Sequence, residues 1–360
     1  MKTKISSIGY VNKIRDNILN IRRKSIAPLY AELKAADCVV CAGSGRSLYS
    51  LNAAMSQIAL SQVGWRNKVI LTPDDPGFPG KSMYDAAADL ARRYKRTLLL
   101  INSGSGYSDD PLVMAQDLAR YIEEKKSSHF SMGLITSSSE SPLAKITSQY
   151  GNVIQLKGRG KSKPSFEYSE TGMMGDIFEL GTLSLLGMMI EAIYRNLEVD
   201  EMFGLCAEEF EKIGAVIDAN VESDTYTQLV DLMEKRTNVF LGDNVYVTRG
   251  VNTPHPRAGD LEILLSYSGE SKPVILWSDV MQKFNGTVLA ITGVKDSTLA
   301  KKANLKIVLE EETKPGAPRR FYTRAAYALS PLPVKLAERL AMRGLKLPEY
   351  IISWYHSVTQ

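Results

Sequence analysis

The feature that most constrains the fold of this 360-residue chain is an internal repeat. Residues 98–124 with 132–156 and residues 262–284 with 287–311 follow the same pattern. Each copy reads as an apolar strand, a Ser/Gly turn, a helix, a strand ending in Ile-Thr, a Ser-x-Leu-Ala-Lys helix start and a final strand. Such alternation of strands and helices is typical of a doubly wound α/β domain with a parallel sheet.

The first copy is preceded by more chain than the second. Residues 1–36 carry apolar positions at helical spacing, and residues 38–60 read as a strand, a glycine turn and a helix. A strongly apolar helix is expected at 177–193, either buried in the chain or used in self-association. We predict two flavodoxin-like α/β/α units, residues 1–200 and a truncated unit at 201–360, which pack as a pseudo-dimer.

Composition narrows the functional class. The chain is 44% hydrophobic and 23% charged, and its net charge of +4 is spread without a long Lys/Arg run. This balance disfavours nucleic-acid binding and suits an anionic metabolite. No signal-peptide core or membrane-length apolar run is evident, so we expect a cytoplasmic protein without membrane contact. Cys38 and Cys41 lie in an apolar run and are interpreted as buried side chains rather than as a redox or metal site.

The segment TLLLINSGSGYSDDP at 97–111 combines a buried strand with a polar turn and a helix start, which we place at Pro111. Backbone N–H groups at a helix N-terminus and serine hydroxyls together favour an anion. An ordinary βα turn has the same composition, so both readings stay open.

Five motifs in order resemble the sugar isomerase (SIS) domain family of phosphosugar isomerases and phosphosugar-binding proteins. They are GSGRS at 43–47, SGSGYS at 103–108, ITSSSESPLA at 135–144, SYSGES at 266–271 and ITGVKDSTLA at 291–300. The chain therefore looks like a tandem SIS protein. Its first half is most similar to 6-phospho-3-hexuloisomerase, in which a glycine turn followed by Arg-Ser occurs with a G-x-x-F-E segment, here residues 175–179.

The resemblance implies roles for individual residues. It makes Glu179 the catalytic base, although a first-turn glutamate can also simply complement a helix dipole. The phosphosugar would contact the glycine turn and both serine-rich turns, through Gly45, Arg46, Ser47, Ser103, Ser105, Gly106, Ser108, Ser266, Ser268 and Ser271. His255 is the candidate for ring opening or proton relay, or alternatively an ordinary surface histidine.

Departures from the family pattern also matter. Asp109 and Asp110 follow the first serine-rich turn and would repel a phosphate unless they point away. The second half lacks a GxGRS turn and an FE segment, with residues 319–329 in the latter's place, so its site is expected to be degraded. A serine hydrolase is disfavoured because Ser103 stands where the G-x-S-x-G nucleophile elbow has its first glycine. NAD binding is disfavoured because Leu48 stands where the dinucleotide-binding fingerprint has its third glycine.

The sequence thus favours an aldose-ketose isomerase that acts on a sugar phosphate through an enediol, without metal or cofactor, as a homodimer or higher homo-oligomer. The alternative is a phosphosugar-binding protein or sensor without catalysis, since one scaffold can serve both roles.

Overall fold

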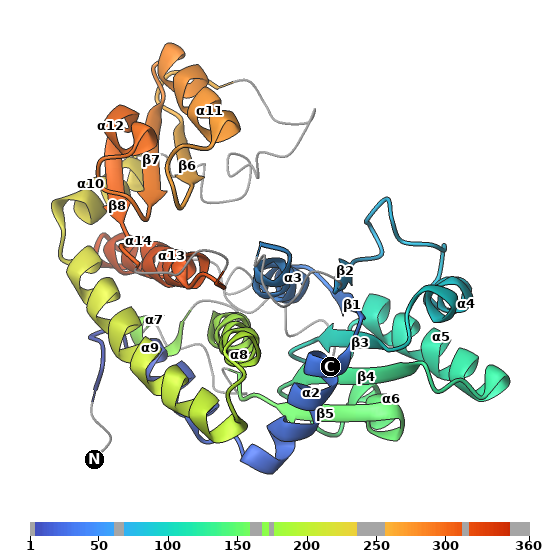
Figure 1. The fold of residues 1–360 in the computed structure, drawn as a ribbon. Coiled ribbons are helices and arrows are strands. Elements are labelled where there is room, and N and C mark those ends of the chain that lie inside the picture. The colour runs from blue at the N-terminus through green and yellow to red at the C-terminus, as the bar shows by residue number, and fades with distance from the viewer. Residues whose placement is uncertain are drawn as a thin grey trace.

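A computed structural model of the chain describes residues 4–60, 68–158, 168–172, 176–235, 256–311 and 317–345 (Figure 1). The first half contains α1 (Gly9–Leu19), α2 (Arg23–Ala35), β1 (Cys38–Gly43), α3 (Arg46–Leu60), β2 (Val69–Leu71), α4 (Met83–Arg93), β3 (Thr97–Asn102), α5 (Asp109–Lys125), β4 (Phe130–Thr136), α6 (Pro142–Tyr150), β5 (Gly151–Gln155), α7 (Tyr168–Thr171) and α8 (Asp176–Tyr194). The second half contains α9 (Val199–Val221), α10 (Asp224–Glu234), β6 (Leu261–Leu265), α11 (Lys272–Lys283), β7 (Thr287–Thr292), α12 (Thr298–Lys302), β8 (Leu305–Val308), α13 (Phe321–Leu329) and α14 (Pro331–Met342).

The first sheet has the strand order β2-β1-β3-β4-β5, and every neighbouring pair is parallel. Its central strand β3 alternates between two hydrophobic clusters. Leu98 and Leu100 face the cluster formed with α2, α3 and α8, whereas Leu99 and Ile101 face the cluster formed with α4, α5 and α6. The result is a three-layer α/β/α unit, which confirms the predicted fold class.

The second sheet repeats part of the first. Its described strands have the order β6-β7-β8 and are parallel, so they correspond to β3, β4 and β5. One face packs against α10, α13 and α14, and the other packs against α11 and α12. Within the described residues, the second unit therefore shares the repeated segment with the first and has the smaller sheet.

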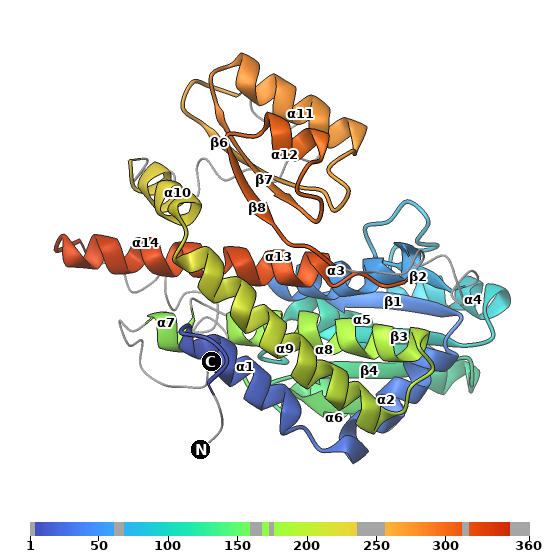
Figure 2. The ribbon, with the colours of Figure 1, turned by 60° about the vertical axis from the view of Figure 1, so that its left-hand side comes forward.

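The apolar helix α8 lies between the two sheets (Figures 1 and 2). It contacts α1, α3, α9 and α13. Its stretch from Ile177 to Tyr194 has a mean hydropathy of 1.5, sufficient by length and composition for a membrane span, yet 78% of it is buried inside the protein. Packing against several helices explains its largely apolar sequence. Of the two predicted roles, burial within the chain and self-association, the structure shows burial within the chain.

Helices α8 and α13 are equivalent elements of the two copies and contact each other directly. Both begin near a phenylalanine that packs on a serine-rich turn, Phe178 in one copy and Phe321 in the other. Six residues beyond each phenylalanine stand Ser184 and Tyr327. Their side-chain oxygens lie 2.8 Å apart, so the two helices meet at equivalent positions.

Helix α9 contains the predicted boundary near residue 200 in its first turn. It packs against α1, α2 and α8 of the first half and against α13 of the second. The helix therefore connects the two halves through side-chain contacts as well as through the chain.

A buried ion network also joins the halves. The Arg320 guanidinium makes hydrogen bonds of 2.7 Å to both carboxylate oxygens of Glu191 on α8, and one of 2.6 Å to Glu209 on α9. Arg324 donates to both oxygens of Glu209, at 2.7 and 2.9 Å. Glu191, Glu209 and Arg324 are each less than 7% exposed. Paired, hydrogen-bonded charges of this kind resist separation, because removing one partner leaves another charge buried.

Candidate functional site

The glycine turn after β1 is shaped by close backbone contacts. A side chain at Gly43 would lie 2.9 Å from the carbonyl oxygen of Asn102 on the neighbouring strand. Gly45 has a φ of +53°, in the left-handed region that glycine adopts without strain. Helix α3 begins directly afterwards at Arg46, so the sequence GSGRS delivers Arg46 and Ser47 to the carboxyl edge of the sheet.

The serine-rich turn after β3 is held by its own hydroxyl groups. The Gly106 N–H donates to Ser103 Oγ at 3.1 Å, and the Tyr107 N–H donates to Ser105 Oγ at 3.2 Å. Ser103 is buried, and its Oγ lies 3.3 Å from Ser108 Oγ. The predicted ligands Ser103, Gly106 and Ser108 are thus brought together.

Helix α5 begins at Asp109, with Ser108 as its N-cap, so the predicted start at Pro111 was two residues late. Proline fits the third position as well as the first, since the first four N–H groups of a helix have no intrahelical acceptor. The Ser108 side chain makes no capping hydrogen bond. Its hydroxyl is instead hydrogen-bonded to Ser103 Oγ.

The two aspartates after this turn are exposed, and Asp110 turns toward the glycine turn. Ser44 Oγ donates to an Asp110 carboxylate oxygen at 3.2 Å. Asp110 thus helps to connect the serine-rich turn to the GSGRS turn.

Glu179 lies where α8 meets both turns. Phe178, its neighbour, packs against Gly104, where a side chain would lie 3.2 Å from the phenylalanine ring. Ser47 Oγ donates to Glu179 Oε1 at 3.2 Å, and Arg46 Nη2 lies 3.6 Å from Glu179 Oε2. The Glu179 side chain is only 12% exposed, while Arg46 is 45% exposed. A carboxylate, a guanidinium and a hydroxyl therefore converge beside the serine-rich turn.

The second serine-rich turn repeats two backbone-to-serine hydrogen bonds of the first. The Gly269 N–H donates to Ser266 Oγ at 3.1 Å, and the Glu270 N–H donates to Ser268 Oγ at 3.2 Å. Ser271 is the N-cap of α11, again without a side-chain capping bond. The predicted residues Ser266, Ser268 and Ser271 thus lie together, 163 positions after their first-unit counterparts.

The surroundings of the second turn differ. Tyr267 replaces Gly104, and its ring packs edge-on against Phe321 at 5.6 Å between centroids. The Arg319 guanidinium lies 3.7 Å from the centre of the Tyr267 ring, and the Tyr267 hydroxyl donates to the Glu311 carbonyl at 3.0 Å. Tyr322 follows Phe321 where Glu179 follows Phe178. Aromatic side chains therefore occupy the places of the open turn and its carboxylate.

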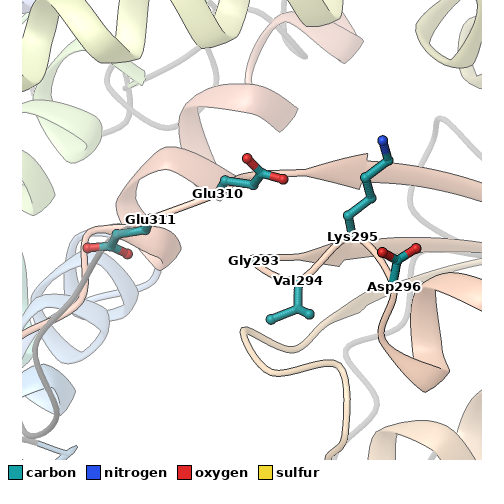
Figure 3. A pocket seen from close by; sticks show the side chains of 6 residues that line it. All are labelled: Gly293, Val294, Lys295, Asp296, Glu310 and Glu311. Atoms are coloured by element: carbon teal, nitrogen blue, oxygen red, sulfur yellow. The ribbon is translucent and has the colours of Figure 1, made fainter.

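A cavity of about 560 Å³ lies in the second unit, at the carboxyl ends of β7 and β8 (Figure 3). It is lined by Gly293, Val294, Lys295, Asp296, Glu310 and Glu311. Three carboxylates and one ammonium give this cavity a negative balance, which opposes a phosphate. The corresponding first-unit residues include Ser137, Ser138 and Lys157, a set that suits an anion better.

Other predicted features have different outcomes. His255 lies outside the described residues. In the part of the chain that the structure describes, no group of three or more His, Cys, Asp or Glu side chains could hold a metal ion. Burial raises the pKa of the Cys38 thiol to about 12, with a further contribution from Asp37, as expected for an inert packed side chain.

Sequence reasoning missed two residues that bond to this site. Ser137 Oγ donates to the Gly104 carbonyl at 2.5 Å, which ties the turn after β4 to the serine-rich turn. Asn102, the last residue of β3, donates to the Ser47 carbonyl. An asparagine directly before the SGSG run was the available signal.

Comparison with known proteins places these motifs in context. A family model, the SIS domain, matches residues 233–327. Uncharacterised proteins of Methanothermobacter thermautotrophicus and Aeropyrum pernix are 36% identical over 85 residues and 30% identical over 86, each covering 24% of this chain. The chain spans only 42% and 41% of the length of these relatives.

Solved structures resemble nearly the whole chain. A candidate tagatose-6-phosphate ketose/aldose isomerase of Clostridium novyi has a TM-score of 0.56 at 16% identity, with 92% of this chain and 86% of that chain covered. A candidate phosphosugar isomerase of Silicibacter pomeroyi has a TM-score of 0.52 at 12% identity, covering 94% and 98%. A candidate sugar-binding protein of Salmonella typhimurium reaches 0.50 at 11% identity, covering 91% and 98%. The SIS domain model thus matches a segment of the second half, and the solved structures share the fold of nearly the whole chain.

Proposed function

We propose that this protein is a phosphosugar isomerase that interconverts an aldose phosphate and a ketose phosphate at the first-unit site. The observation that carries the proposal is the convergence of Glu179 with Ser47 and Arg46 beside a serine-rich turn. Solved structures of similar fold bear the names of isomerases and of a sugar-binding protein, which supports a sugar phosphate as ligand.

The phosphate would be held by the hydroxyls of Ser103, Ser105 and Ser108. Ser103 Oγ accepts the Gly106 N–H and shares one hydrogen bond with Ser108 Oγ, so the remaining hydroxyl hydrogen of this serine pair would point toward a bound anion. The amide-rich start of α5 adds a favourable dipole end. A phosphate bound there would lie near Gly104, against which Phe178 packs, and so near the neighbouring residue Glu179.

The reaction would proceed by proton transfer between adjacent carbons. Glu179 as carboxylate would remove the proton from the hydroxyl-bearing carbon next to the carbonyl; the C–H electron pair forms the C=C bond, and the carbonyl π pair moves to its oxygen to give an enediolate. Glu179 then returns the proton to the former carbonyl carbon, the hydroxyl proton of the first carbon passes to the oxyanion, and the new C=O bond forms at the first carbon. Arg46 would stabilise the oxyanion that develops, because its charge lies beside the reacting centre.

The test is isomerisation of a panel of sugar phosphates, followed by NMR of the parent and of Glu179→Gln. We expect kcat to fall by about 10²- to 10⁴-fold while ligand-induced thermal shift persists. Tyr322→Phe, the same position in the second copy, is the matched control and should leave kcat unchanged. A Glu179→Gln variant as fast as the parent would contradict the mechanism.

Finer features belong to the same proposal. We propose a tandem SIS arrangement with units 1–200 and 201–360, closest to 6-phospho-3-hexuloisomerase in the first half, in a cytoplasmic homo-oligomer. The two backbone-to-serine hydrogen bonds that recur in both serine-rich turns support two SIS units. His255 stays a candidate proton relay.

The second candidate is a phosphosugar sensor without catalysis. It is favoured by the second unit, where Tyr267 and Tyr322 stand in place of Gly104 and Glu179. Binding of sugar phosphates without any isomerisation would select this function. Fold similarity does not decide between them, because one scaffold hosts both roles.

A further inference from the structure

We propose that Asn102 is a positioning residue that fixes the distance between Ser47 and the proposed base Glu179; the inference rests on the proposed function. Asn102 is fully buried at the end of β3, opposite Gly43 in the parallel register. Its side chain forms hydrogen bonds with two different helices of the site.

The first helix is α3. Asn102 Nδ2 donates to the Ser47 carbonyl at 2.8 Å and to Ser50 Oγ at 3.1 Å. The orientation of the amide is determined by chemistry, since a carbonyl oxygen can only accept. Ser50 Oγ donates its own hydrogen to the Ser47 carbonyl at 3.0 Å, so it can accept the hydrogen bond from Asn102 Nδ2.

The second helix is α8. Thr182 Oγ1 donates to Asn102 Oδ1 at 3.2 Å, and Thr182 is fully buried. Glu179 lies three residues earlier, on the adjacent turn and the same side of α8. One amide group therefore connects the residue that donates to Glu179 with the helix that carries Glu179.

The internal repeat provides a comparison for this role. Leu265 precedes Ser266 where Asn102 precedes Ser103, and Ala325 stands four residues after Phe321 where Thr182 stands four after Phe178. Both second-unit residues belong to the hydrophobic cluster around β7 and α13. The first copy, which has Glu179, thus has the polar pair Asn102 and Thr182. The second copy, which has Tyr322, has the apolar pair Leu265 and Ala325. The repeated serine-rich turn itself does not need the asparagine.

The experiment transfers the second-unit pair into the first unit. Asn102→Leu, Thr182→Ala and the double variant are assayed for kcat and KM and for ligand-induced thermal shift. We expect Asn102→Leu to lower kcat on the order of 100-fold, since a displacement of about 1 Å can cost that much. KM should change by no more than about threefold, because the phosphate turn stays intact. A purely structural role would lower stability without this split.

A double-mutant comparison of Asn102 and Ser47 provides a second readout. In a Ser47→Ala background, Asn102→Leu should cost much less than in the parent, since both changes remove the same contact to Glu179. Fully additive losses would overturn the inference. If Asn102→Leu does not fold, Thr182→Val removes a single hydrogen bond and should lower kcat by about 10-fold at similar KM; an unchanged kcat would again overturn it.

A crystal structure of the variant separates this inference from the proposed function. We expect the 3.2 Å contact between Ser47 Oγ and Glu179 Oε1 to be lost in Asn102→Leu. A retained contact refutes the positioning role whatever the activity. If the parent shows no isomerisation and the contact is still lost in the variant, the proposed function fails while the positioning of the pair by Asn102 stands.

Discussion

The two serine-rich turns share their internal hydrogen bonds and differ in what surrounds them. Gly106 bonds to Ser103 as Gly269 bonds to Ser266, at 3.1 Å in both cases. The first turn faces a carboxylate on α8, whereas the second is covered by Tyr267. The same turn thus forms in both units, and what differs is the set of side chains that pack beside it from α8 or from α13.

The differences between the copies also occur together. Where the first unit has Gly104, the second has Tyr267, which donates to the Glu311 carbonyl and contacts Arg319. A turn closed in this way needs no positioned base. We therefore expect changes to equivalent residues to have different effects on ligand binding in the two units.

The largest effect is expected where the units are joined. Arg320→Met removes the partner that Glu191 and Glu209 share, while Arg195 and Arg324 stay beside them, so the free energy of unfolding should fall by about 3 kcal/mol, the low end for a broken buried pair. Urea denaturation measures the change. Arg195→Met is the control, because Arg195 also pairs with Glu191 but is 49% exposed. A loss below about 1 kcal/mol for Arg320→Met, within the range of surface pairs, would show that the network does not hold the halves together.

The next effect sharpens the comparison of the two sheets. Glu262 stands at the position of Leu99, and burial raises its pKa from 4.5 to about 7. The folded state therefore binds a proton more tightly than the unfolded state, and stability falls as the pH rises from about 4.5 to about 7.

Glu262→Leu should remove this penalty, which is up to about 3 kcal/mol above pH 7. Unfolding followed at pH 5 and pH 8 tests the sign: the variant should gain more at pH 8. Equal gains at both pH values would mean that the carboxyl group does not titrate in this range.

A third comparison uses the glycines of the turns. Gly106 and Gly269 have φ values of +72° and +63°, and a side chain on either would overlap the side chain of the following helix cap, Ser141 or Ser297. Gly106→Ala should weaken sugar-phosphate binding about 100-fold, since the proposed hydrogen bonds of Ser103 and Ser108 to the phosphate would be displaced. Gly269→Ala should lower the melting temperature and leave ligand affinity unchanged. Comparable losses of affinity would show that both turns bind the ligand.

The smallest effect concerns single hydroxyls. Ser105→Ala should cost about 1 kcal/mol of binding free energy, the ordinary value of one hydrogen bond, and Ser268→Ala should cost none. Isothermal titration with a sugar phosphate compares them. A larger loss for Ser268→Ala would assign the ligand to the second unit.

Much of the fold was predictable from the sequence because the signals are local. The repeat gave the order of strands and turns, and apolar runs such as Leu98 to Ile101 identified strands covered on both faces. The gathering of Ser103, Gly106 and Ser108 follows from one turn. The pairing of Arg46 and Ser47 with Glu179 was predicted only as a shared site, through the family resemblance.

The rest depends on contacts between distant segments. Asn102 reaches Thr182 across 80 positions, and Arg320 reaches Glu191 across 129, so no spacing rule finds them. The helix start at Asp109 was missed because proline is tolerated throughout the first turn. Burial of Glu262 in an otherwise apolar cluster contradicts the usual pattern, and a carboxylate at such a position looks exposed in the sequence.

The contact between Ser184 and Tyr327 has a consequence for symmetry. In a dimer of identical chains, a residue on the twofold axis meets its own copy, so the position must be self-complementary. Two tyrosines would collide there, and two serines would leave a gap. With both halves in one chain, a small residue and a large one can face each other, and each half can change without imposing the same change on its partner. The unequal pair Ser184 and Tyr327 thus shows that the two halves can differ at equivalent positions. Glu179 in the first half and Tyr322 in the second are another such pair.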